Sequence, residues 1–319
     1  MRDTIVRKNL ALTQEDITKI HTYRNTLFQQ AGEEWKAYQQ LFIDVNQQIR
    51  KHKTSFAVPI KRSIVGLYTC EVVINTQTFR FLLDTGAQIS GMLSSGIQAL
   101  QLVSLKRNIQ MGSVGGAQQA TQLFLCDKLT IGDMDVLKQP LLELDHKHFS
   151  LPYLNVSIMN FDGILGWDIL RHLDFEIDDK NRMFRILDDD ITFPYKNFLS
   201  LSFPVVIVQD GQNNVQAFGF DSGAKDTWVA KNYIQNSDAK IIRNVEALGM
   251  GVLGVERLAM QQINEVTLYL HYAKLVFREL FSGRVDMLKN ISLCGVLGNR
   301  MFRNRSIQVY NSKSFMRIL

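Results

Sequence analysis

Two short segments of the chain hold an aspartate in surroundings that suit acid–base chemistry. Asp84 and Asp221 each follow a run of apolar residues and precede Thr-Gly-Ala or Ser-Gly-Ala. Apolar surroundings raise the pKa of a carboxyl group, and two carboxyl groups in contact cannot both ionise. A pair that shares one proton can deprotonate a water molecule with its charged member and protonate a carbonyl oxygen with its neutral member. The segments predict such a pair if the fold brings Asp84 and Asp221 together.

The chain repeats itself around these aspartates. Asp84 and Asp221 are 221 − 84 = 137 residues apart, and the elements Asp162–Gly166 and Cys294–Gly298 are 295 − 163 = 132 residues apart. Two further anchors recur in the same order, Met111–Gly115 with Met250–Gly254 and Phe175–Ile177 with Ile307–Val309. Anchors in one order at nearly constant offsets indicate an internal duplication. Each half then contributes one aspartate.

Each half is predicted to be mainly β. Hairpins that end at an aspartate are expected over Cys70–Leu83 and Val205–Phe220, because apolar runs flank a polar turn in both. A short helix is expected after each second glycine element, over 167–172 and 299–304. We expect three units, a helical extension over residues 1–54, a first lobe over 55–190 and a second lobe over 191–319.

The N-terminal extension lies outside the duplication. Thr13 precedes Gln-Glu-Asp, which is a good helix N-cap followed by acidic residues. Apolar residues continue with helical spacing as far as Ile49. The pattern fits a packing element, an oligomer contact, or a pro-segment that covers the site and is later removed.

At the aspartate segments the sequence resembles the aspartic proteases. Asp84–Ala87 and Asp221–Ala224 are similar to the catalytic signature of that family, and the elements around Gly163 and Gly295 to its second signature. The resemblance covers residues 57–319. In both segments alanine follows the glycine, and in this the sequence resembles the retropepsin-like branch of the aspartic proteases. This implies a mainly β, bilobal aspartic protease fold with two homologous β-barrel lobes, and an aspartic endopeptidase in which Asp84 and Asp221 are catalytic.

Further site residues follow from the same resemblance. The residues expected to support the catalytic loops are Thr85, Gly86, Ser222, Gly223, Gly163, Gly166, Gly295 and Gly298. The residues expected in two substrate-binding flaps are Met111, Gly112, Gly115, Gly116, Met250, Gly251 and Gly254. The hydroxyls of Thr85 and Ser222 are expected to bond neighbouring backbone. Because Ala87 and Ala224 lack a hydroxyl to bond the carboxylates, the pKa values of the pair should rise toward neutral. A peptide or protein substrate is expected, with no cofactor or metal.

Other patterns suggest different chemistry less strongly. Gly249–Gly254 fits Gly-x-Gly-x-x-Gly, but a dinucleotide site needs a following helix and a later acidic residue that is absent here. His146 and His148 suggest a solvated loop rather than metal ligands. Cys294 is expected to be buried rather than nucleophilic. Trp228 is expected to pack in the core, with a place near a flap as the alternative.

Composition narrows the class of protein. The 319 residues are 46% hydrophobic and 21% charged, which is typical of a globular protein. No apolar run approaches the roughly 18 residues of a membrane-spanning helix, and the first residues lack a secretory signal. Three widely spaced cysteines predict reduced thiols. The net charge is +5 with Lys and Arg scattered along the chain, which predicts no nucleic-acid partner. We expect a cytoplasmic protein, with oligomerisation possible through the N-terminal helices. A catalytically silent peptide-binding protein and an enzyme blocked by its own N-terminal helices stay open as alternatives.

Overall fold

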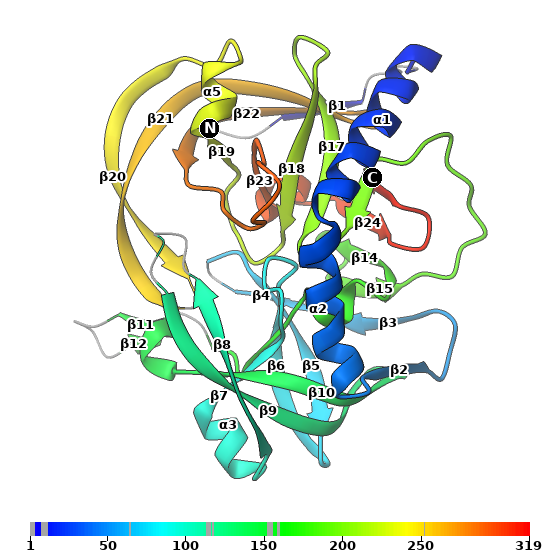
Figure 1. Cartoon of the computed structure of the whole chain (residues 1–319), viewed down its shortest axis with the longest axis vertical. Helices are drawn as coiled ribbons and strands as arrows, with labels where there is room; N and C mark the ends of the chain where they lie inside the picture. Colours follow the sequence, from blue (N-terminus) through cyan, green and yellow to red (C-terminus); the bar gives the residue numbers. More distant parts are fainter. Residues whose placement is uncertain are drawn as a thin grey trace.

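Strands dominate the structure (Figure 1). The computed structural model describes residues 4–7, 12–63, 65–112, 116, 118–151, 156–157, 160–251 and 253–319. The strands form two nine-stranded sheets, a five-stranded sheet and a two-stranded sheet. In these ranges no helix is long and apolar enough to cross a membrane. The expectation of a mainly β protein is confirmed.

The first nine-stranded sheet comes from the first half of the chain. Its strands are β2 (Gln48–Lys51), β4 (Lys61–Arg62), β5 (Tyr68–Ile74), β6 (Gln77–Leu83), β7 (Gly91–Leu93), β8 (Val103–Gly112), β9 (Gln118–Ile131), β10 (Met134–Leu144) and β13 (Gly163–Leu165). The order is β2-β10-β7-β13-β6-β5-β9-β8, with β4 beside β5. Because β9 also pairs with β10, the strands from β10 to β9 close into a ring.

The second nine-stranded sheet repeats this arrangement. Its strands are β1 (Thr4–Arg7), β16 (Phe198–Ser200), β17 (Pro204–Asp210), β18 (Val215–Asp221), β19 (Trp228–Ala230), β20 (Ile241–Gly251), β21 (Gly254–Leu270), β22 (Ala273–Gly283) and β23 (Gly295–Gly298). The order is β1-β22-β19-β23-β18-β17-β21-β20, with β16 beside β17 and β21 also paired with β22. Each strand therefore has a counterpart at the same place in the first sheet. The hairpins expected around both aspartates are present as β5–β6 and β17–β18.

A five-stranded sheet joins the two halves. Its strands are β3 (Phe56–Pro59), β14 (Asp174–Asp178), β15 (Met183–Ile186), β24 (Ser306–Tyr310) and β25 (Phe315–Ile318), in the order β25-β24-β14-β15-β3. At its centre Glu176 pairs with Gln308, and the Gln308 Nε2 donates to Glu176 Oε2 at 2.9 Å. These two residues are equivalent in the repeat, since 308 − 176 = 132. A pairing of equivalent residues is what a two-fold relation between the halves requires.

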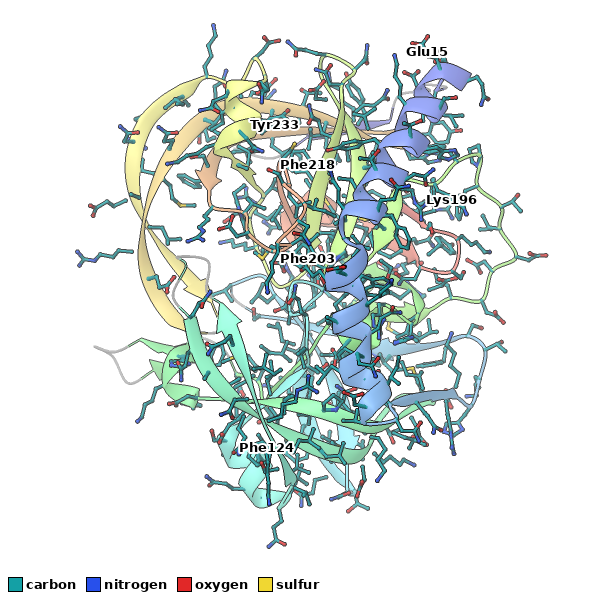
Figure 2. The ribbon with its side chains drawn as sticks, in the orientation of Figure 1. Glu15, Phe124, Lys196, Phe203, Phe218 and Tyr233 are labelled. Carbon is teal, nitrogen blue, oxygen red and sulfur yellow. The ribbon has the colours of Figure 1, made fainter. Side chains whose placement is uncertain are left out.

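Short elements connect these sheets. They are α3 (Ser94–Ala99), the 3₁₀ helix η1 (His146–Phe149), β11 (Ser150–Leu151), β12 (Val156–Ser157), α4 (Trp167–Leu170), α5 (Lys231–Gln235) and the 3₁₀ helix η2 (Asn299–Phe302). The helices expected after the second glycine elements are thus present as α4 and η2, each a single turn. Fully buried aromatic side chains such as Phe203 and Phe218 lie in the interior of the second half (Figure 2).

The N-terminal helices lie across both halves of the molecule (Figure 1). Helix α1 (Gln14–Gln30) begins with a capping box, in which Thr13 Oγ1 accepts from Asp16 N at 3.2 Å. Its apolar side chains pack on the second half. In α2 (Gly32–Asp44), Trp35 still packs on the second half, whereas Tyr38, Leu41 and Phe42 pack on the first.

The helical pattern was predicted to continue to Ile49, and that was wrong. Helix α2 ends at Asp44, and Asn46 adopts φ +57°. This left-handed conformation ends a helix because it turns the chain away from its axis. Ile49 therefore lies in β2, opposite Val136 at the edge of the first sheet.

Candidate active site

The ends of β6 and β18 bring the two aspartates together. Strand β6 runs parallel to β13, and β18 runs parallel to β23, so each aspartate lies beside the second glycine element of its own half. Asp84 and Asp221 are half-buried, and their carboxyl groups are hydrogen-bonded to each other. The two aspartates that the repeat singled out therefore meet.

Backbone donors hold one oxygen of each carboxyl group. Asp84 Oδ1 accepts from the N–H groups of Gly86 at 2.8 Å and Ala87 at 3.1 Å. Asp221 Oδ1 accepts from Gly223 at 2.8 Å and Ala224 at 2.9 Å. Such donors stabilise negative charge and fix the orientation of both groups. All four of these bonds end on an Oδ1 atom, and none of them on Oδ2 of Asp84 or Asp221.

Burial sets the protonation of the pair. It is the main cause that raises the pKa of both Asp84 and Asp221. The Asp84 charge raises the pKa of Asp221 further, to well above its ordinary value. Because the two groups titrate together, the proton belongs to the pair rather than to one residue. One shared proton is the state that their contact favours.

The hydroxyl side chains next to the aspartates cross-link the two halves. Thr85 Oγ1 donates to Phe220 O at 2.9 Å and accepts from Ser222 N at the same distance. Ser222 Oγ donates to Leu83 O at 2.8 Å and accepts from Thr85 N at 3.0 Å. The sequence led us to expect bonds to neighbouring backbone, whereas the partners lie 135 to 139 residues away. The four bonds fix the distance between the loops that carry the aspartates.

This cross-link makes Thr85 a strong determinant of stability. We expect Thr85→Val to lower the free energy of unfolding by about 3 kcal/mol, because it leaves the buried Ser222 N–H without its acceptor and removes a second bond. Thr85→Ser keeps the hydroxyl and is the matched control. Chemical denaturation should separate the variants, and equal midpoints for Val and Ser would contradict the assignment.

Glycine is required where the two loops pass each other. A Cβ at Gly86 would lie 2.5 Å from both carboxyl oxygens of Asp221. A Cβ at Gly223 would lie 2.5 Å from Asp84 Oδ2. Real Cβ atoms do not approach other atoms so closely, so neither loop accepts a side chain here without moving the opposite aspartate.

The second glycine elements support the loops from the other side. A Cβ at Gly166 would lie 2.7 Å from Ala87 O, and one at Gly298 would lie 2.5 Å from Asp226 O. Gly163 and Gly295 pack as closely against Phe81 and Phe218, respectively. The bonds Trp167 N to Ala87 O and Asn299 N to Ala224 O, at 2.7 and 2.8 Å, complete a matching support in each half.

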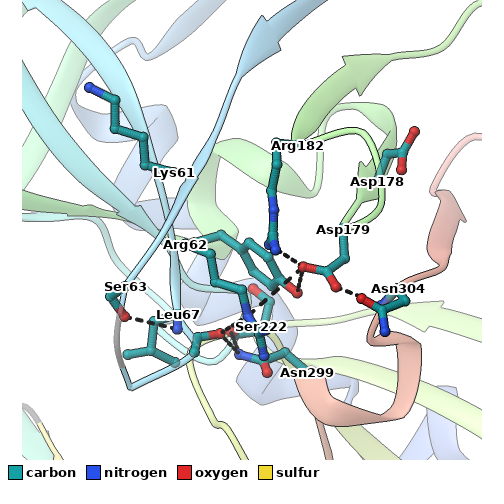
Figure 3. A network of polar contacts seen from close by, with 12 residues as sticks. Lys61, Arg62, Ser63, Leu67, Asp178, Asp179, Arg182, Ser222, Asn299 and Asn304 are labelled. Atoms are coloured by element: carbon teal, nitrogen blue, oxygen red, sulfur yellow. Dashed lines mark hydrogen bonds and ion pairs between the residues drawn. The ribbon is translucent and has the colours of Figure 1, made fainter.

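Three supporting residues were missed from the sequence. The buried Asn299 side chain donates to Ser222 O and Gly66 O, at 3.1 Å each (Figure 3). In the first half the fully buried Asp168 accepts from Ser90 Oγ at 2.7 Å and Gln139 Nε2 at 2.5 Å, and burial raises its pKa to about 6. The sequence signal was their position just after Gly166 or Gly298. The third is Tyr38 on α2, whose hydroxyl donates to Gln88 O at 2.6 Å. No sequence signal marked it, because Tyr38 lies outside the repeat and Gln88 lies within it.

Two hairpins occupy the places expected for flaps. Strands β8 and β9 pair up to Gly112 and Gln118, and β20 and β21 up to Gly251 and Gly254. Each tip lies near the opposite half: a side chain at Gly116 would meet Arg284, and Gly254 lies beside His148. Met111 is buried and the backbone of Met250 lies in β20, whereas Gly115 falls outside the described residues.

The remaining patterns have structural explanations. Gly249–Gly254 spans the tip of the β20–β21 hairpin, and no helix follows it, so it lacks the dinucleotide-binding context. Cys294 is buried, and burial raises the pKa of its thiol to about 11. Trp228 packs against the apolar cluster of the second half. Across the described ranges no three His, Cys, Asp or Glu side chains form a cluster suited to a metal.

A comparison with known protein families finds a match within the first of the two halves. Residues 70–169 match the family described as aspartyl protease. The match includes Asp84 and the element around Gly163, and it ends before Asp221. No curated protein matches the chain. The match supports a peptidase-type function in general.

Proposed function

We propose that the protein is an aspartic endopeptidase with a bilobal, retropepsin-like fold and one active site shared by both lobes. The observation that carries this proposal is the hydrogen-bonded pair of Asp84 and Asp221, held by four backbone N–H donors. The lobes correspond to residues 55–190 and 191–319, with residues 1–54 as an extension. The matching orders β10-β7-β13-β6-β5-β9-β8 and β22-β19-β23-β18-β17-β21-β20 support two equivalent lobes, and the extension adds one edge strand to each, β2 and β1.

In this mechanism water is the nucleophile. The charged member of the pair takes a proton from a water molecule bound between the carboxyl groups, and the oxygen attacks the carbonyl carbon of the peptide bond. The neutral member donates its proton to the carbonyl oxygen, which gives a tetrahedral intermediate without an acyl-enzyme. Collapse of this intermediate, with a proton delivered to the leaving nitrogen, breaks the C–N bond.

The two hairpins act as flaps over an extended substrate. Their backbone groups can bond a peptide strand, and their closure excludes water from the reacting groups. The contacts of the tips with the opposite halves, at Arg284 and His148, support this role.

The pH profile tests the shared proton. Since the pKa values of both aspartates are raised, the singly protonated pair should persist to higher pH than for isolated carboxyl groups. We expect kcat/KM to remain substantial at about pH 6 or above, as for pairs of the retroviral type. A kcat/KM profile on a cleaved peptide measures this, and a sharp optimum below roughly pH 3 would contradict it.

The raised pKa values of Asp84 and Asp221 should also make the folded protein more stable at low pH than at high pH. A folded-state pKa above the unfolded value means that the folded protein binds the proton more tightly, so this stabilisation is complete below about pH 4 and is lost as pH rises through the folded pKa. Asp168, with a pKa raised to about 6, contributes in the same sense. The activity profile rather than the stability profile therefore isolates the pair.

Incubation with a mixed peptide library and mass-spectrometric identification of products tests the proposal. Internal cleavage that requires both aspartates supports an endopeptidase. Peptide binding without cleavage would instead identify a silent peptide-binding protein.

A further inference from the structure

Helix α2 contacts the loop that follows Asp84. Tyr38 Oη donates to the carbonyl oxygen of Gln88 at 2.6 Å. The Gln88 side chain then reaches the second half, where its Nε2 donates to Met287 O at 3.0 Å. Glu34, one turn before Tyr38, accepts from Lys289 N at 2.9 Å. Helix α2, the first aspartate loop and the 287–289 segment therefore meet at one place.

Helix α2 is held firmly at this place. The Arg171 guanidinium lies 5.2 Å from the ring centres of both Trp35 and Tyr38, and 5.3 Å from that of Phe42. Such cation–π contacts stabilise a packed helix face. Burial raises the pKa of Tyr38 well above its ordinary value, so the hydroxyl stays neutral and donates to Gln88. Leu41 is buried in the same apolar cluster of the first half.

The equivalent place in the second half is different. Lys225 corresponds to Gln88, since 225 − 88 = 137, and it is exposed. Its carbonyl oxygen accepts from Arg300 N of its own half at 3.1 Å, where Gln88 accepts from Tyr38 of the extension. The two-fold relation is therefore broken two residues beyond the glycine of each loop.

These two positions lie on opposite sides of the aspartate pair. The pseudo-two-fold axis relates one loop to the other and passes between Asp84 and Asp221. If an extended peptide with its scissile bond over the pair follows the line that joins these two positions, one end runs toward Gln88 and the other toward Lys225. The Gln88 end meets α2 and the bridge to Met287, whereas the Lys225 end meets an exposed side chain.

We propose that helix α2 closes the substrate cleft at the Gln88 end and leaves the Lys225 end open. The preferred substrate is then a polypeptide cut within a few residues of one terminus, with a long chain on the other side. The N-terminal segment is in this case a permanent wall of the cleft. This inference rests on the proposed peptidase activity.

A ladder of peptides tests the closed end. Library products first give a cleaved sequence, which is then lengthened one residue at a time on either side of the scissile bond. We expect kcat/KM to fall by at least about tenfold on extension of one side and to hold or rise on the other. Equal tolerance on both sides, with cleavage that still requires Asp84, would overturn the inference and leave the proposed function intact.

Variants at the two equivalent positions identify the closed side. Gln88→Ala removes the bridge to Met287 and should restore most of the rate for peptides extended on the disfavoured side. Lys225→Ala is the matched control and should leave the asymmetry unchanged. Tyr38→Ala removes the side chain through which α2 contacts Gln88 and should relieve the same side even if Gln88→Ala folds poorly, with Tyr23→Ala on α1 as its control. An asymmetry that no variant at Gln88 or Tyr38 alters would overturn the assignment to α2, and absence of any cleavage would overturn the proposed function itself.

Discussion

Asp84→Asn and Asp221→Asn are each expected to lower kcat/KM for peptide hydrolysis by about 10³-fold or more. Asparagine keeps the shape of the carboxyl group and can accept the bonds from the loop N–H groups. It can neither take a proton from water nor share one with the other aspartate. The whole acid–base function is therefore lost with either residue, although the fold is kept.

Stability separates this effect from unfolding. Each carboxyl group has a raised pKa, which means that its charged form opposes folding. The Asn variants should therefore be at least as stable as the parent protein at neutral pH. Asp133→Asn, at a surface turn where the aspartate pairs with Lys53, is a control that should keep full activity. A wild-type rate in either variant of the pair would exclude a role for that aspartate.

Gly86→Ala is expected to abolish most activity through geometry alone. The new Cβ would overlap the carboxyl group of Asp221 and force the pair apart. We expect kcat/KM to fall by about 10²-fold or more, since small displacements of reacting groups carry penalties of this size. Gly223→Ala should have the same effect, because its Cβ would overlap Asp84.

Gly211→Ala is the matched control for these glycine variants. Gly211 lies in the turn of the β17–β18 hairpin, and the nearest atom to its Cβ would be 3.8 Å away. Activity should be unchanged there. Wild-type activity in Gly86→Ala would show that the loops can separate without loss, and would contradict the close contact of the two halves.

The parts that the sequence predicted are those that the repeat encodes locally. The hairpins before Asp84 and Asp221, the turns after Gly166 and Gly298, and the close glycines all depend on short segments with apolar alternation and turn residues. The meeting of the aspartates was predictable only because the repeat implied a two-fold arrangement. A single copy of either segment would have indicated a turn and nothing more.

What could not be predicted depends on contacts between distant segments. The hydroxyls of Thr85 and Ser222 choose partners in the opposite half, and no local pattern marks that choice. The helical spacing up to Ile49 was misleading, because Ile49 pairs with Val136 of β10, a distant partner that the local pattern does not mark. The bond from Tyr38 to Gln88 joins the extension to the repeat, and its partner is 50 residues away.

The most direct test of one site shared by two halves is the double variant Asp84→Asn/Asp221→Asn, measured beside both single variants on one cleaved peptide. Residues that act as a unit are non-additive, so the double variant should be no slower than the slower single variant. Independent contributions would multiply, and the double variant would then lose activity by the product of the two single effects. That multiplied loss, or a single variant with the wild-type rate, would contradict the account.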